Sequence, residues 1–293
     1  MKGIVSFGGY DPIWRLPRED IGKTLGTAPL RGERAVAGID EDVITMGVEA
    51  LLDALKGFER DKVRALFFAT TSSPYREKQC ASIISRVLDL DKDTFTADFG
   101  GSIRAGTNAL RTAILSEEKG YILVGASDIR LGYAKRQEEQ LFGDASGALI
   151  LGDGDVVAKV LGMSSTYDEI MDVWRTEKFV QTWEQRWVIT HGYRDNMVRA
   201  VKNLLSETNT KPEDINRVIL SSPDMRSYQD VARSLGFDPK AQVMEPLILE
   251  VGNSGCAHPL LCLSYALELS EPGDKILLAG YGDGADAFLF EVT

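Results

Sequence analysis

Continuous runs of Val, Ile, Leu and Phe are the most prominent pattern in the chain, and each predicts a buried β-strand. They lie within residues 63–74, 121–128, 142–151, 217–223, 275–280 and 282–290. A strand with one face in water would alternate apolar and polar residues, so these strands are expected to be covered on both faces. Residues 1–10 read as an opening strand.

Segments with the period of an α-helix separate these strands. Residues 42–55 place Val48 and Leu51 on one apolar stripe, and residues 193–205 carry a similar stripe through Met197 and Val201. Helices that alternate with buried strands predict an α/β fold with right-handed crossovers and layers of helix on sheet.

The order of these elements repeats once along the chain. Each half has a strand ending in Ser-Ser-Pro, then a Gly-rich turn that opens a helix, then a closing strand hairpin; the turns lie at residues 98–107 and 251–259. We therefore predict two pseudo-symmetric halves, residues 1–155 and 156–293, packed as one αβαβα sandwich with helices buried between the sheets.

Composition and charge narrow the classes of function. The chain has 293 residues, 44% of them hydrophobic, and a formal net charge of −11, which argues against sequence-independent nucleic-acid binding. No apolar run approaches the roughly 18 residues that span a bilayer, and the first residues do not resemble a signal peptide, so we expect a cytoplasmic protein without membrane contact. An anionic ligand would need a local basic patch, for which the candidates are Arg130, Lys135, Arg136, Arg194 and Arg199.

The three cysteines, Cys80, Cys256 and Cys262, show no metal-binding spacing. We therefore expect neither a disulfide framework nor a metal site. This cysteine content fits a reducing compartment.

Candidate chemistry gathers where the predicted strands end. Ligands of open α/β sheets collect at the carboxyl ends of strands, where the chain carries Ser102, Ile103, Ser221 and Asn253. Pseudo-symmetry would place the turn at Ser102 opposite the turn at Asn253. A helix that starts after a tight turn offers free N–H groups and a positive dipole end, which suit a nucleophile or an oxyanion.

Several segments resemble the thiolase superfamily, in its 3-hydroxy-3-methylglutaryl-CoA synthase and ketoacyl synthase III-like branch. They are residues 38–46, 72–75, 126–132, 139–144, 172–175, 252–254 and 272–278. The resemblance covers nearly the whole chain, which is shorter than is typical of the family. It implies a thiolase-like sandwich, an acyl-CoA substrate or ligand with no bound cofactor, and a homodimer or pseudo-dimer formed through edge strands.

The resemblance also implies roles for individual residues. In the family a Cys takes the acyl group from CoA, a Glu acts as acid and base, and a His and an Asn bind the second thioester. Glu41 matches the Glu and Asn253 matches the Asn, whereas Ile103 stands at the Cys position and Ser221 at the His position. Two of the four chemical groups are therefore missing.

Other residues offer alternative chemistry, and each has a structural interpretation beside it. Ser102 could replace the nucleophile with His258 as its base, or it could cap the helix that follows. Glu41 also fits an acidic helix start. Cys256 begins a buried helix and is either an activated thiolate or a buried free cysteine.

Three functions remain open from the sequence. The chain is either an acyl-CoA-handling subunit of a heteromeric complex, or an active condensing or retro-Claisen enzyme that uses Glu41, Asn253 and Ser102 or His258, or a purely structural partner. In the first case the resemblance implies an active thiolase-type subunit or an OB-fold, zinc-ribbon acyl-CoA-binding protein as partner.

Overall fold

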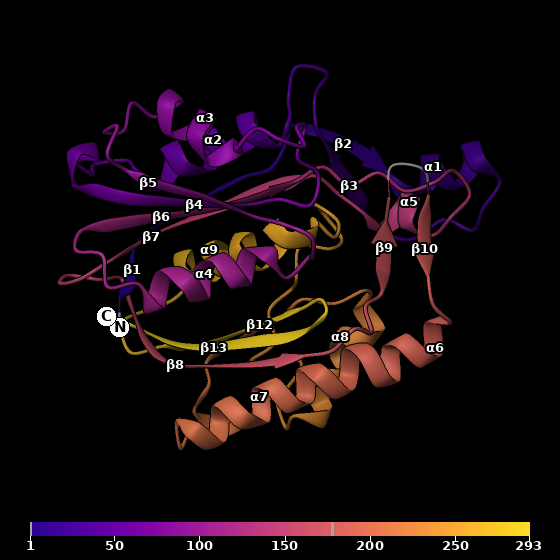
Figure 1. The fold of residues 1–293 in the computed structure, drawn as a ribbon. Coiled ribbons are helices and arrows are strands. Elements are labelled where there is room, and N and C mark those ends of the chain that lie inside the picture. Colours follow the sequence, from indigo (N-terminus) through magenta and orange to yellow (C-terminus); the bar gives the residue numbers. More distant parts are fainter. Residues whose placement is uncertain (1, 177–178) are drawn as a thin grey trace.

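Two buried helices lie between two β-sheets, and further helices cover the outer face of each sheet (Figure 1). The computed structural model describes residues 2–176 and 179–293. The outer face of the first sheet is covered by α2 (Val43–Ala54) and α3 (Cys80–Val87). The buried middle layer consists of α4 (Ala105–Leu115) and α9 (His258–Glu268). The outer face of the second sheet is covered by α7 (Asp195–Glu207) and α8 (Met225–Ser234). The predicted αβαβα sandwich is confirmed.

The first sheet is built by the N-terminal part of the chain. Its strands are β1 (Gly3–Tyr10), β4 (Val63–Ala69), β5 (Phe95–Phe99), β6 (Tyr121–Asp128) and β7 (Ala145–Gly152), in the spatial order β1-β7-β6-β4-β5. β4 is parallel to β5 and β6, and β7 is antiparallel to β6 and β1. Helices cover both faces of β4 and β6, which explains why these strands are continuous apolar runs.

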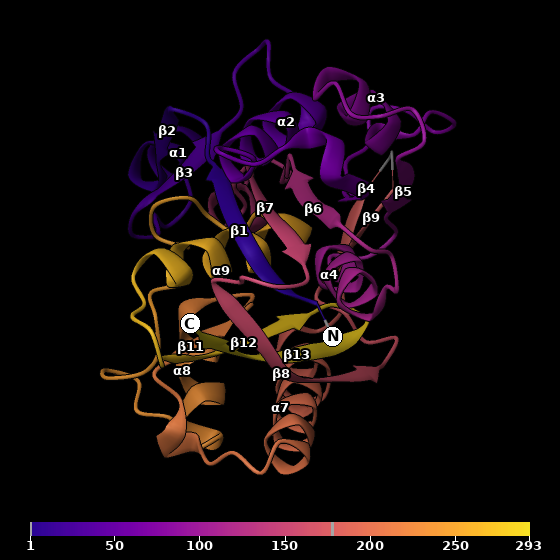
Figure 2. The same ribbon diagram turned by 90° about the vertical axis from the view of Figure 1, so that its left-hand side faces the viewer.

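The second sheet is built by the C-terminal part. Its strands are β8 (Ala158–Tyr167), β11 (Arg217–Leu220), β12 (Lys275–Tyr281) and β13 (Gly284–Val292), in the order β8-β13-β12-β11. Among the described residues, the two sheets meet through one residue pair, Ile4 of β1 with Ala158 of β8. Figure 2 shows the same layers from the side. The position that corresponds to β5 is reduced in this half to one bridge between Val218 and Val243.

Short elements gather at one end of the sandwich, at the right of Figure 1. They are β2 (Trp14–Pro17), α1 (Arg18–Leu25), β3 (Glu33–Val36), α5 (Glu138–Leu141), β9 (Val173–Arg175), β10 (Val180–Thr182) and α6 (Gln185–Trp187), which continues through a π-helix (Val188–Arg194) into α7; three 3₁₀ turns cover Arg60–Lys62, Pro212–Asp214 and Gly255–Ala257. Their apolar runs are too short for the sequence pattern to reveal them. Of these elements, α5, β9, β10, α6 and the π-helix contribute to the wall of the candidate site.

Individual residues fix where the predicted helices begin and how closely they pack. The carboxylate of Asp42 accepts hydrogen bonds from the backbone N–H groups of Ile44 (2.9 Å) and Thr45 (2.8 Å), so it caps α2 at the predicted start. Gly106 lets the start of α4 lie close to the 3₁₀ turn that precedes α9, because a Cβ at this position would lie 2.1 Å from the carbonyl oxygen of Cys256 in that turn. The beginnings of the two buried helices are thereby held against each other.

Within the described ranges, no helix combines the length and the apolar character that crossing a bilayer requires.

Candidate functional site

An inner cavity of about 20 Å³ lies where the two buried helices begin. It is lined by Ile103, Asp172, Ser221, Ser222, Pro223, Asn253, Gly255, His258 and Tyr281. The structure thus brings together four of the residues predicted from the sequence: Ile103, Ser221, Asn253 and His258. This volume is close to the minimum that holds one water molecule, so Ile103 and its neighbours leave little open space.

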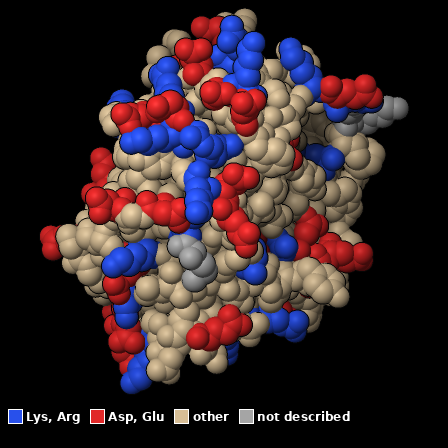
Figure 3. All heavy atoms as spheres, turned by 60° about the vertical axis from the view of Figure 1, so that its left-hand side comes forward, with Lys and Arg blue, Asp and Glu red and all other residues tan. Residues whose placement is uncertain are grey.

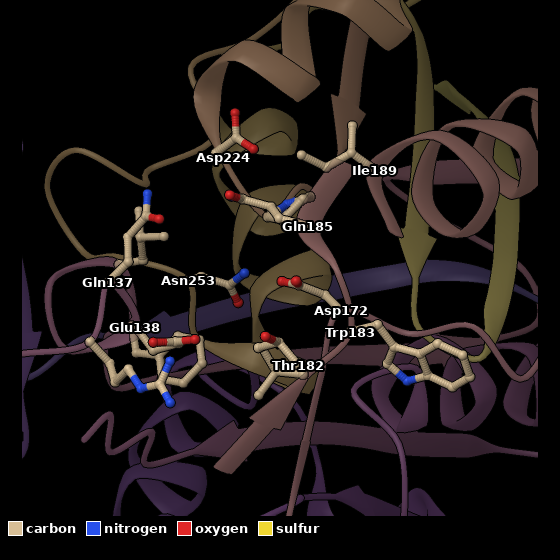
Figure 4. A pocket seen from close by; sticks show the side chains of 14 residues that line it. Gln137, Glu138, Asp172, Thr182, Trp183, Gln185, Ile189, Asp224 and Asn253 are labelled. Atoms are coloured by element: carbon tan, nitrogen blue, oxygen red, sulfur yellow. The ribbon is translucent and has the colours of Figure 1, made fainter. Parts of the chain in front are cut away.

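An outer cavity of about 220 Å³ adjoins the inner one and shares lining residues with it. Its wall comes from α5, from the segment around β9, β10 and α6, and from the starts of α8 and α9, and it includes Glu138, Trp183, Gln185, Ile189 and Asp224 (Figure 4). Asp172, Pro223 and Asn253 line both cavities. These three residues form the neck between the cavities.

A third hollow, of about 400 Å³, adjoins the outer cavity and shares Gln137, Leu141 and Asp224 with it. Its other lining residues include Arg18, Arg31 and Arg226. Arg31 and Arg226 are exposed, whereas Arg18 is buried and donates to the carbonyl oxygens of Arg31 and Ile248. A hollow with exposed guanidinium groups can attract an anionic group against the negative net charge of the chain.

The basic patch proposed from the sequence does not form as predicted. Arg130 is buried, Arg199 lies on α7 at the outer face of the second sheet, and Arg136 lines the outer cavity. On the face shown in Figure 3, acidic and basic side chains are interspersed over the described residues. The positive charges that line the outer cavity and the third hollow therefore include Arg136, Arg31 and Arg226, and two of these three lie far from 130–136 in the sequence.

Arg130 follows β6 and has a structural role inside the site. It donates from Nη1 to the amide oxygen of Asn253 (2.7 Å), and its guanidinium carbon lies 3.7 Å from the ring centroid of Phe142. Burial lowers the pKa of Arg130 to about 10, so the side chain stays positively charged at neutral pH. The sequence offered no sign of this burial, because it depends on contacts between the two halves.

Asn253 is held in one orientation. Its amide oxygen accepts from Arg130 Nη1 and from the backbone N–H of Gly255 (3.0 Å), and its amide nitrogen donates to the carbonyl oxygen of Ser222 (3.3 Å). An amide nitrogen carries two hydrogens, so a second donor remains for a ligand at the neck.

Asp172 is the functional candidate that sequence reasoning missed. It precedes β9, and burial raises the pKa of its carboxyl group to about 6, although the positive charge of Arg130 opposes that rise. It belongs to the segment 172–175 that carries the family resemblance, which is the one signal that could have drawn attention to it. At neutral pH it is a carboxylate that can accept a proton.

Ile103 and Ser102 are both fixed against the turn between β12 and β13. A Cβ added to Gly282 would lie 2.6 Å from Cγ1 of Ile103. Ser102 donates to the carboxylate of Asp283 and accepts from the backbone N–H of Arg104 (3.2 Å). Ser102 is not among the residues that line the inner cavity, and His258 is not among its hydrogen-bond partners in the described chain.

Glu41 precedes α2 and points toward β1. Its carboxylate accepts from the Tyr10 hydroxyl and from the backbone N–H of Gly38. The bond to Glu41 is the main reason that the pKa of Tyr10 is raised to about 12. Glu41 lines neither the inner nor the outer cavity, so its catalytic role stays a prediction.

His258 is buried at the first position of α9. Its Nδ1 lies 3.3 Å from Ser254 Oγ, and its Nε2 lies 3.6 Å from Cys262 Sγ. Burial, with a smaller effect from Arg130, lowers the pKa of His258 to about 4, so the imidazole is neutral at physiological pH.

The three cysteines are buried and free. Burial, followed by the charge of Asp128, raises the pKa of the Cys256 thiol well above its ordinary value. This favours the interpretation of Cys256 as a core residue over an activated thiolate. Across residues 2–176 and 179–293, no group of His, Cys, Asp and Glu side chains has the arrangement of a metal site.

Comparison with known proteins identifies the family. The chain is 33% identical over 302 residues to a hydroxymethylglutaryl-CoA synthase of Pyrococcus furiosus, an alignment that covers 99% of this chain and 86% of that protein. The chain belongs to the hydroxymethylglutaryl-CoA synthase family. A second synthase, from Methanocaldococcus jannaschii, is 31% identical over 306 residues, with 100% of this chain and 89% of that protein covered.

Other comparisons place the family within its wider fold. Residues 205–289 match the C-terminal domain of 3-oxoacyl-[acyl-carrier-protein] synthase III. The structure of that synthase from Aquifex aeolicus superposes with a TM-score of 0.88 at 20% identity, covering 99% of this chain and 100% of the other. A hydroxymethylglutaryl-CoA synthase complexed with CoA gives 0.87 at 20% identity, covering 100% of this chain and 82% of the other. The resemblance to the thiolase superfamily is confirmed, and the chain is a member of its acyl-CoA condensing branch.

Proposed function

We propose that this synthase-family chain binds acyl-CoA but forms no covalent acyl-enzyme, and that it works as a subunit of a heteromeric complex for C–C bond formation or thiolysis. The observation that carries the proposal is Ile103, which lies at the start of α4 and lines the inner cavity where the family resemblance expects a Cys. A side chain without a lone pair cannot accept an acyl group.

The surroundings of Ile103 support the loss of the covalent route. Ser221 occupies the expected His position in the same cavity, and its buried hydroxyl has no hydrogen-bond partner in the described part of the chain. Ser102 is engaged by Asp283, and the pKa of Cys256 is raised, so neither is poised as a substitute nucleophile.

Acyl-CoA binding is supported by the outer cavity and by the third hollow that adjoins it. A solved relative with the same fold carries CoA, a ligand with several negative charges. Arg136 in the outer cavity and Arg31 and Arg226 in the third hollow supply complementary charge for such a ligand. The inner cavity then has room for only a very small acyl group.

A partner is supported by exposed apolar side chains near the start of the chain. Ile13, Trp14 and Ile39 are largely exposed, and the backbone at Gly38 lies beside the Trp14 indole. Clustered exposed apolar residues are typical of protein interfaces. We propose an active thiolase-type subunit or an OB-fold acyl-CoA-binding protein as the partner.

Two measurements test this function. Affinity purification from the native source is expected to yield a heteromeric complex that binds acetyl-CoA by calorimetry, and intact-mass spectrometry after incubation is expected to show no acyl adduct. An adduct on Ser102, or full condensing activity of the isolated chain with a covalent intermediate, would contradict the proposal. A complex that binds no acyl-CoA would instead support a purely structural role.

A second candidate function is an active enzyme without a covalent intermediate. It is favoured by one observation, the carboxylate of Asp172 beside the amide of Asn253 at the neck.

A further inference from the structure

The neck between the cavities is formed by a carboxylate and an amide from different parts of the chain. Asp172 precedes β9, and Asn253 precedes the 3₁₀ turn that leads into α9. Both side chains point into the outer cavity in Figure 4, and both also line the inner one. A ligand that extends from the outer cavity into the inner one can therefore contact both groups.

The amide of Asn253 can present only its nitrogen to such a ligand. Its oxygen is already occupied by Arg130 Nη1 (2.7 Å) and by the N–H of Gly255 (3.0 Å). The nitrogen makes one long bond, 3.3 Å to the carbonyl oxygen of Ser222. Asn253 is thus an oriented hydrogen-bond donor, the kind of group that stabilises a developing oxyanion.

Asp172 has the protonation behaviour of a general base. Among the described residues, the charged and titratable groups around it include Arg130 after β6, Arg136 and Glu138 beside the outer cavity, Asp224 before α8, Tyr281 of β12 and the neutral His258 of α9. Burial and the two neighbouring carboxylates raise its pKa to about 6, against the opposing effect of Arg130. A base is most effective when its pKa lies near the working pH.

We propose that Asp172 removes the α-proton of a short acyl thioester whose carbonyl oxygen is bound by Asn253, so that the site forms an enolate without an acyl-enzyme. This inference rests on the proposed acyl-CoA binding. The C–H bond breaks, and its electron pair forms the C=C bond of the enolate. The carbonyl electrons move to the oxygen beside the Asn253 amide, and the proton passes to the Asp172 carboxylate. The reverse step returns a proton to carbon, so no other reactant is needed.

The size of the inner cavity defines the substrate class. At about 20 Å³ it holds a group the size of a water molecule or a methyl group, and the wall facing it includes Ile103 and Tyr281. The acyl group that fits is therefore acetyl, with its methyl group in the inner cavity beside Asp172 and its carbonyl oxygen toward Asn253 at the neck. Longer acyl chains meet the wall.

The test is hydrogen–deuterium exchange at the α-carbon of acetyl-CoA in D₂O, followed by mass spectrometry with the purified full-length chain. Wild-type protein is expected to exchange deuterium into the methyl group above the buffer rate. Asp172→Asn is expected to lower this rate about a hundredfold, the usual size of a general-base contribution, while calorimetry shows that acetyl-CoA still binds. Butyryl-CoA is expected to exchange much more slowly than acetyl-CoA.

Two further variants separate this base from other carboxylates. Glu169→Gln removes an exposed carboxylate three residues earlier in the same segment and is expected to leave exchange unchanged. Glu41→Gln removes the carboxylate that the family resemblance favours. Loss of exchange in Glu41→Gln with retention in Asp172→Asn would overturn the inference.

The pH dependence of the exchange rate distinguishes Asp172 as a base from Asp172 as a purely structural residue. The carboxylate is the active form, so exchange is expected to fall as the pH drops through about 6. Acetyl-CoA that binds wild-type protein without exchanging would refute this inference alone. Acetyl-CoA that does not bind at all would refute the proposed function as well.

Discussion

Arg130 Nη1 lies 2.7 Å from the amide oxygen of Asn253, so a side chain that follows β6 in the first half holds the amide that precedes α9 in the second. The same guanidinium packs on the ring of Phe142 and is buried near Asp172. One buried cation thus joins the two halves at the neck of the cavities and orients a group proposed to bind the thioester.

Arg130→Met is expected to destabilise the fold by about 3 kcal/mol, because buried acidic neighbours lose their positive partner. It should also raise the pKa of Asp172 further, since Arg130 opposes the effect of burial. Urea unfolding measures the first effect, and the pH profile of α-proton exchange measures the second. Arg233→Met removes an exposed ion-pair partner of Asp230 and serves as the control, with an expected change below about 1 kcal/mol.

Restoring the two missing family groups should restore covalent chemistry. The double variant with Ile103→Cys and Ser221→His places a thiol and an imidazole around the inner cavity. Incubation with acetyl-CoA is expected to add one acetyl group to the protein by intact mass, because the imidazole can activate the thiol. Each single variant should acylate far more slowly. Acylation of the wild-type chain would show that the degenerate interpretation is wrong.

Ser102→Ala distinguishes a structural serine from a nucleophile. The hydroxyl bonds Asp283 and the N–H of Arg104, so its loss is expected to cost about 1 kcal/mol of unfolding free energy. Acetyl-CoA binding and α-proton exchange should remain within a factor of a few. Abolished exchange in a folded Ser102→Ala protein would assign the serine to the chemistry.

His258 and Asp172 should make opposite contributions to the pH dependence of stability. His258 has a pKa of about 4 in the folded chain against its ordinary 6.5, so its stabilising effect is complete above pH 6.5 and is lost as the pH falls toward 4. The folded pKa of Asp172 is raised to about 6, so its effect on stability is lost as the pH rises.

The measurement is the difference in unfolding free energy between wild type and His258→Gln at several pH values. This difference is expected to shrink by about 3 kcal/mol between pH 6.5 and pH 4, the size that a shift of this kind implies. Asp172→Asn should give a difference that changes in the opposite direction. A His258→Gln difference that does not vary with pH would mean that the imidazole titrates normally in the folded chain.

Much of the fold could be predicted because its signals are local. The run 63–69 is apolar along its whole length, which requires cover on both faces, and it forms β4 with helices on either side. Asp42 before an apolar stripe marks the start of α2. Because these signals depend only on neighbours in the chain, the helix and strand layers could be expected from residue order alone. The meeting of Ile103 with Asn253 could be expected only from the predicted pseudo-symmetry and the family motifs.

The short elements at one end of the sandwich escaped prediction for the same reason. The two small sheets, β2 with β3 and β9 with β10, consist of strands only three or four residues long. Strands this short carry no periodic pattern in the sequence. Val173 of β9 and Thr182 of β10 nevertheless line the outer cavity. Sequence patterns therefore predicted the residues of the inner cavity better than those of the outer cavity.

The sequence by itself determined the layered α/β architecture, the family and the absence of a thiol at the start of α4, because these depend on the type and order of residues. Only the tertiary structure decided that Arg130 is buried, that Glu41 bonds Tyr10 outside the cavities, and that Asp172 reaches the neck beside Asn253. The physical reason is that burial, and the pKa shifts that follow from it, depend on contacts between residues far apart in the chain.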